Sequence, residues 1–166
     1  MRSDRLVFAL ALLLLGSRVS AQQLPVDRLA PAWSPRYQSA AEALSNVTLA
    51  ATIGLDTWQS WQAPNRAHAF ERQGERAGVV IAAVLLTKVL VHRSRPCAPS
   101  CGVDNPRFSF FSGHTAIAFA AVGPRLTVTI PLASSTGYFR IAANRHYLTD
   151  VLAGAAVGVA TREVLR

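Results

Sequence analysis

Apolar positions along the chain fall into runs that polar, proline-rich or glycine-rich segments separate. Their spacing predicts helices over residues 38–55, Gly78–Val91, Gly113–Val122, 125–141 and Leu148–Leu165. Ser112 stands at the N-cap position of the third helix, where a serine oxygen can accept a free backbone N–H. The pattern predicts an all-α fold, a compact bundle of about five helices.

The first 21 residues have the pattern of an export signal. Arg2 and Arg5 precede the apolar run Val7–Leu15, and small residues lead to a cleavage site after Ala21. We therefore expect residues 1–21 to be a signal peptide, and the mature protein to be periplasmic or on the outer face of the cytoplasmic membrane. An uncleaved segment that anchors the chain to the membrane is the alternative. Residues 22–37, with three prolines, are expected to form an extended leader into the domain at 38–166.

The apolar runs are short compared with a membrane span, which needs about 20 residues. Only 25 residues separate His114 from Arg140. If both residues serve one site, the segment between them forms two antiparallel helices of about ten residues each. Each helix is then ~15 Å long, which is too short to cross a hydrocarbon core of about 30 Å. A soluble or surface-associated bundle is therefore expected.

Composition limits the chain to one ordered domain and points toward anionic partners. Of the 166 residues, 51% are hydrophobic and 16% charged, which allows one buried core and excludes a disordered chain. The formal net charge of +8 favours nucleic acid, an acidic membrane surface or phosphate as partner. Nucleic acid is not expected, because no interleaving of basic and aromatic residues accompanies the charge. Lys88 is the only lysine, and no pattern indicates an oligomeric state.

Two cysteines, Cys97 and Cys101, lie four residues apart in a proline-containing loop. In an exported protein this spacing favours a local disulfide. A metal-binding pair is the alternative, although no second pair accompanies it.

Three polar segments carry the candidate chemistry. They are KVLVHRSRP from Lys88 to Pro96, FSGHT from Phe111 to Thr115, and FRIAANRHYLTD from Phe139 to Asp150. Their order and spacing resemble the signature of the type 2 phosphatidic acid phosphatase and vanadium haloperoxidase superfamily, over roughly residues 77–160. The matching residues are Lys88, Arg95, Pro96, Ser112, Gly113, His114, Arg140, His146 and Asp150. Phe111 and Phe139 depart from the signature, which has Pro and Ser at these positions.

The resemblance implies a phosphatase-like domain that hydrolyses phosphate monoesters or diphosphates without a metal ion. His146 would be the nucleophile that forms a phosphohistidine, and Asp150 would orient it. His114 would protonate the leaving oxygen and then activate water. The substrate would be a phosphorylated molecule, a lipid phosphate or a related compound, which makes association with a membrane surface an expectation. No cofactor is implied, and vanadate should bind as a phosphate mimic.

The chemistry of phosphoryl transfer supports a phosphate-binding role for the basic residues. The transition state spreads negative charge over three oxygens, which Lys88, Arg95 and Arg140 can stabilise. Lys88 and Arg95 are seven residues apart and face one side if the helix extends that far. Free N–H groups at a helix start can bind phosphate, which assigns Ser112 and Gly113 to the same site.

The spacing of His146 and Asp150 supports the catalytic roles. An i, i+4 pair is adjacent on one helical face if the helix already covers both residues. The Asp150 carboxylate could then accept Nδ1–H and leave Nε2 of His146 free to attack phosphorus. The carboxylates are otherwise scattered, so no metal site is expected.

Other residues receive secondary roles. Arg93, Arg107 and Arg145 are expected to extend the positive field, and His92 to be structural. Substrate selectivity is expected from aromatic walls: Trp58, Trp61, Phe108, Phe110 and Phe111. Two other functions stay open, a vanadate-dependent haloperoxidase and a non-catalytic module that binds anions or lipid head groups at a membrane.

Overall fold

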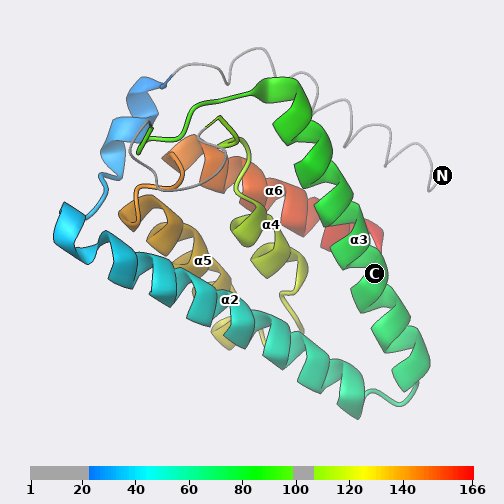
Figure 1. The fold of residues 1–166 in the computed structure, drawn as a ribbon. Coiled ribbons are helices and arrows are strands. Elements are labelled where there is room, and N and C mark those ends of the chain that lie inside the picture. Colours follow the sequence, from blue (N-terminus) through cyan, green and yellow to red (C-terminus); the bar gives the residue numbers. More distant parts are fainter. Residues whose placement is uncertain (1–22, 99–106) are drawn as a thin grey trace.

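The structure is a computed structural model that describes residues 23–98 and 107–166. Within these residues every regular element is helical, which confirms the all-α class (Figure 1). The elements are a 3-10 turn, η1 (Pro25–Leu29), and five α-helices: α2 (Pro35–Gln62), α3 (Arg66–Val91), α4 (Gly113–Ala120), α5 (Leu126–Ala142) and α6 (Leu148–Val164). The expected signal peptide, residues 1–21, and Cys101 lie outside the described residues.

The short helix α4 lies at the centre of the bundle and contacts each of α2, α3, α5 and α6 (Figure 1). Its closest neighbour is α6, which meets it through small residues. A Cβ on Gly154 would lie 2.5 Å from the Ser112 carbonyl oxygen, and a Cβ on Gly158 would overlap the Ala116 carbonyl oxygen. The two glycines therefore let α6 approach the backbone of α4 directly.

Helices α2 and α3 are both longer than the pattern predicted. Helix α2 includes Trp58 and Trp61, and α3 begins at Arg66 instead of residue 78. The Asn65 side chain caps α3 by accepting the His68 N–H at 3.1 Å. Between the two helices, Arg76 donates to both carboxylate oxygens of Asp56 at 3.0 and 3.1 Å. This contact with α2 stabilises the polar first half of α3. That half has few apolar positions, so the hydrophobic pattern does not predict that it is helical.

The described part of the expected leader, residues 23–37, is not extended throughout. It contains η1, and α2 begins at Pro35. Prolines stand in the first turn of both elements, where the missing N–H would have no intrahelical acceptor. The segment is also packed on the bundle, because the Trp33 N–H donates to the Ala142 carbonyl at 3.0 Å and the Asp27 side chain is buried.

No helix among the described residues combines the length and apolar character that a membrane span requires. The apolar core consists of small clusters of buried side chains. The largest cluster includes Phe110 and Phe111. These two side chains are 9% and 0% exposed. They are core residues, and the expectation that they line a substrate wall is wrong.

Candidate active site

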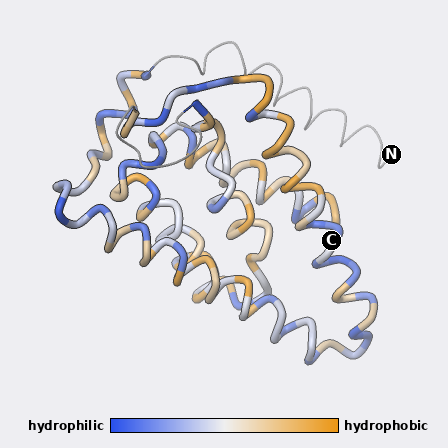
Figure 2. The backbone as a smooth tube through the Cα atoms, viewed as in Figure 1, coloured by the Kyte–Doolittle hydropathy of each residue, from blue (hydrophilic) through white to orange (hydrophobic). Residues whose placement is uncertain are grey.

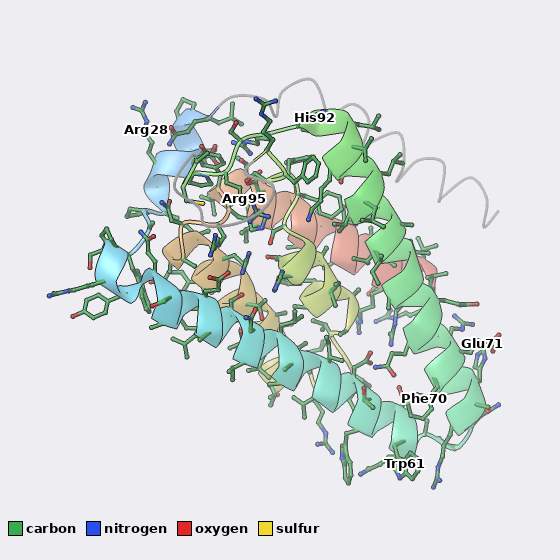
Figure 3. The ribbon with its side chains drawn as sticks, viewed as in Figure 1. Arg28, Trp61, Phe70, Glu71, His92 and Arg95 are labelled. Carbon is green, nitrogen blue, oxygen red and sulfur yellow. The ribbon has the colours of Figure 1, made fainter. Side chains whose placement is uncertain are left out.

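The candidate residues from all three polar segments meet at one end of the bundle. Lys88 lies in the last turn of α3, Arg140 in the last turn of α5, and Ser112 to His114 at the start of α4. Arg95 lies at this end, together with Arg28 and His92, whereas Trp61 and Phe70 lie at the far end (Figure 3). Trp61 is therefore remote from the site, and its expected role as a wall is wrong.

Arg95 reaches the site from a loop and not from an extended helix. Helix α3 ends at Val91, and His92 adopts a left-handed conformation with φ 47°. Pro96 also disfavours helical geometry at Arg95. The conditional expectation that Lys88 and Arg95 share one helical face is therefore not met, yet both reach the same site, where each charge acts on the other. His92 stacks near Phe108, with ring centroids 6.1 Å apart, which agrees with a structural role.

Lys88, Arg95 and Arg140 form a cluster of cations with a shortage of partners. Burial, followed by the charges of Arg95 and Arg140, lowers the pKa of Lys88. Burial also lowers the pKa of Arg140, to about 10, and Arg95 contributes to this shift. The Nε atoms of Arg95 and Arg140 are buried and have no hydrogen-bond partner. Buried donors of this kind are costly unless they are satisfied, so an anion would stabilise the cluster.

Glu42 of α2 is the counterion of this cluster, and the sequence interpretation missed it. Its carboxylate lies 2.7 Å from the Arg145 guanidinium and 3.7 Å from that of Arg140. Burial acts to raise the pKa of Glu42, but the hydrogen bond from Arg145 and the nearby positive charges lower it overall. Glu42 is 103 positions from Arg145 in sequence, and nothing in its local pattern distinguishes it from a surface glutamate.

His146 lies in a turn before α6 and not on the helix, so the condition for one helical face shared with Asp150 is not met. The turn forms because Asn144 adopts φ 58° and the N–H groups of Arg145 and His146 both donate to the Arg140 carbonyl. His146 is 3% exposed, and burial lowers its pKa to about 4 against the opposing effect of Asp150. The imidazole is therefore neutral at pH 7, the state that a nitrogen nucleophile needs.

Asp150, in the first turn of α6, lies beside the His146 imidazole. One carboxylate oxygen is 3.7 Å from Nδ1 of His146, which is an ion-pair distance and longer than a hydrogen bond. The same oxygen accepts the Tyr147 N–H at 3.0 Å and the Ser109 hydroxyl. Burial acts to raise the pKa of Asp150, but His146, Arg93 and Ser109 lower it overall, so the carboxylate stays charged at pH 7.

Arg93 does not extend the positive field as expected. Its guanidinium is 2% exposed and pairs with Asp150 and, at 2.7 Å, with Asp27. Two carboxylates thus neutralise its charge inside the protein. Arg145 is engaged by Glu42, and Arg107 is exposed.

His114 faces the cations from the first turn of α4. Burial lowers its pKa to about 4, and the charges of Arg140, His146, Lys88 and Arg95 add to the shift. The Ser112 N–H donates to the Asp150 carbonyl at 3.0 Å, which ties the start of α4 to α6. Ser112 occupies the predicted N-cap position but makes no side-chain cap; its hydroxyl accepts from Thr115 at 2.9 Å.

The remaining candidate residues make packing contacts or a covalent bond. Gly113 packs closely against α3, because a Cβ there would lie 3.3 Å from a Val84 methyl group. Phe139 packs edge-on against Trp33, with ring centroids 5.9 Å apart. Cys97 is disulfide-bonded. In the part of the chain that the structure describes, no group of three His, Cys, Asp or Glu side chains is arranged to hold a metal ion.

A family profile described as the PAP2 superfamily matches residues 76–164. A lipid A 1-phosphatase of Porphyromonas gingivalis is 43% identical to the chain over 67 residues. That match covers 34% of this chain and only 15% of the relative's length. No solved structure matches the chain.

Proposed function

Because the chain belongs to the PAP2 superfamily, we propose that it is a phosphatase that hydrolyses phosphate monoesters or diphosphates through a phosphohistidine, without a metal ion. The observation that carries the proposal is the pair of unpartnered Nε donors on Arg95 and Arg140, placed beside two neutral histidines. Anion binding alone would account for the cations. It would not account for a buried, neutral His146 held next to a charged carboxylate.

In the first step, Nε2 of His146 attacks phosphorus while the bond from phosphorus to the leaving oxygen breaks. Asp150 keeps the proton on Nδ1 and stabilises the positive charge that develops on the imidazole. Lys88, Arg95 and Arg140 stabilise the negative charge on the equatorial oxygens. His114 gives its proton to the leaving oxygen, which leaves as an alcohol or a phosphate.

In the second step, neutral His114 removes a proton from water, and the resulting oxygen nucleophile attacks phosphorus. The bond from phosphorus to Nε2 breaks, its electron pair returns to His146, and inorganic phosphate forms. His114 must carry a proton at the start, although its pKa is about 4 in the free protein. A substrate that binds as the monoanion brings this proton, and its remaining negative charge raises the pKa of His114.

A phosphorylated lipid is the substrate class that the protein surface favours. Helix α3 carries Lys88, and around that residue the helix exposes large apolar side chains to solvent, of which Leu85 is 60% and Val89 63% exposed. Figure 2 shows that this half of α3 is hydrophobic, whereas the turn between α2 and α3 is hydrophilic. An apolar face beside a cationic site suits binding at a membrane surface. The relative that is named a lipid A 1-phosphatase points the same way. An exported location, in the periplasm or on the outer membrane face, fits this substrate.

The proposal is tested with purified protein and p-nitrophenyl phosphate. We expect turnover that survives EDTA and that vanadate blocks. The His146→Ala variant should lose activity, whereas the matched control His68→Ala, at an exposed position on α3, should retain it. Rapid acid-free quenching should trap a labelled phosphohistidine that is stable in base. Activity that persists in His146→Ala, or that EDTA removes, would contradict the mechanism.

The lipid assignment is tested separately. Turnover of a short-chain lipid phosphate in vesicles should exceed that of the water-soluble ester, and Val89→Lys should reduce only the lipid activity. Equal effects of Val89→Lys on both substrates would count against the membrane-facing role of α3.

A further inference from the structure

Asp27 lies in η1, far outside residues 76–164 that the family profile matches, yet it contacts the candidate active site. Figure 3 shows η1, marked by Arg28, at the same end of the bundle as Arg95. The Asp27 carboxylate is completely buried, and each of its oxygens has two partners. One accepts the N–H and the hydroxyl of Thr149 at 2.9 and 2.7 Å; the other accepts Arg93 and the Leu24 N–H at 2.7 and 2.9 Å.

The contact with Thr149 supplies a cap for α6 from a distant part of the chain. Thr149 is the second residue of α6, so its N–H has no acceptor within the helix. The side chain of Tyr147, at the N-cap position, makes no cap hydrogen bond. Asp27 therefore satisfies one free donor of α6, and Asp150 satisfies the Tyr147 N–H. Both carboxylates also interact favourably with the positive end of the helix dipole.

The contact with Arg93 joins Asp27 to the catalytic carboxylate. Arg93 pairs with both Asp27 and Asp150, donates to Thr149 at 2.7 Å, and stacks 4.3 Å from the Tyr147 ring centroid. These contacts surround the residues that follow His146 directly. Without Asp27, the Arg93 guanidinium would have Asp150 as its one remaining carboxylate partner among the described residues. The first turn of α6 would also lose the carboxylate that caps the Thr149 N–H.

We propose that Asp27 is a positioning residue, which fixes the first turn of α6 and, through Arg93, the orientation of Asp150 toward His146. The inference rests on the proposed function, because it concerns how well the nucleophile is oriented. Asp27 does not reach the cation cluster, so it should act on the chemical step and not on phosphate binding. The N-terminal segment thus completes an active site whose reacting groups all lie within the family domain.

The test compares Asp27→Asn with Asp56→Asn. Both aspartates are buried and paired with an arginine, but Asp56 joins α2 to α3 through Arg76. Both variants should lower the unfolding free energy. Measured well below the melting temperature, Asp27→Asn should lower kcat about tenfold to a hundredfold, with the inhibition constant of inorganic phosphate within about twofold of wild type. Asp56→Asn should leave kcat unchanged.

A milder variant covers the case in which Asp27→Asn does not fold. Thr149→Val removes the hydroxyl that lies between Asp27 and Arg93 and leaves the backbone cap in place. It should also lower kcat with phosphate inhibition unchanged. The proposal is overturned if the folded Asp27 variant, or Thr149→Val in its place, keeps the wild-type kcat. It is equally overturned if phosphate affinity falls in parallel with kcat. A wild-type protein without turnover would instead refute the proposed function, and this inference with it.

Discussion

The close packing of α6 on α4 offers a quantitative test of how the site is held. In Gly154→Ala the added methyl group would lie 2.5 Å from the Ser112 carbonyl oxygen and 3.4 Å from the Ala116 nitrogen. An ordinary contact starts at about 3.4 Å, so the start of α4 must move by roughly 1 Å. That segment carries His114, and its position is coupled to α6 by the hydrogen bond from the Ser112 N–H to the Asp150 carbonyl.

Two opposing effects set the expected stability of Gly154→Ala. Replacing a helical glycine by alanine stabilises a helix by about 1 kcal/mol, whereas overpacking a tight contact costs about 1–3 kcal/mol. The net loss should be about 0–2 kcal/mol, so the protein stays folded. A displacement of about 1 Å at a reacting group can lower the rate about a hundredfold. Gly154→Ala should therefore lose much more activity than stability.

The matched control is Gly78→Ala, the same substitution within α3. A Cβ at Gly78 would have nothing within 4 Å, so this variant should gain about 0.5–1 kcal/mol and keep its activity. Urea unfolding gives the free energies, and p-nitrophenyl phosphate hydrolysis gives kcat. If Gly154→Ala keeps kcat within about twofold of wild type, Gly154 does not set the position of His114.

Three further predictions concern charge at the site. The pKa values of His146 and His114 both fall from 6.5 to about 4 on folding, so between these values the unfolded chain binds protons that the native protein lacks. In urea unfolding, each histidine should lower the free energy of unfolding by about 3 kcal/mol from pH 6.5 to pH 4, and His146→Gln should lose less stability than wild type by about that amount. Lys88→Met should raise the free energy of unfolding and weaken phosphate inhibition at least about tenfold, since it relieves repulsion among the cations and removes one phosphate ligand. Glu42→Gln should have the opposite effect, with lower stability and tighter phosphate inhibition, because it removes the counterion of Arg140 and Arg145.

The residues whose meeting at one site could be predicted from the sequence are those that the order and spacing of the polar segments identify. His114, Arg140 and His146 occupy fixed positions in the polar segments, and the helices between them follow from apolar runs. Helix boundaries that depend on contacts between elements are harder to predict from the sequence. The first half of α3 has little apolar face of its own, and its contacts with α2 include the pair of Arg76 with Asp56.

The residues that could not be predicted are those whose partners lie far away in the chain. The sequence shows the charge of Arg93 but not the two carboxylates around it, so it predicts wrongly that Arg93 adds to the positive field at the site. Asp27 is 66 positions from Arg93 and 122 from Thr149, so only the folded chain reveals this contact. Glu42 is similar, since its role follows from the packing of α2 beside the end of α5.

The charges at the site explain how one environment can prepare two histidines for different roles. Burial keeps both imidazoles neutral in the free protein. On the proposed mechanism, the neutral state suits His146 as the nucleophile beside Asp150, but it leaves His114 without the proton that it must donate. Arg140, Lys88 and Arg95, which depress the pKa of His114, are the proposed phosphate ligands, so on this mechanism bound substrate offsets their effect at His114. On the proposed mechanism, the substrate therefore supplies both the charge that raises the pKa of His114 and the proton that His114 returns to the leaving oxygen.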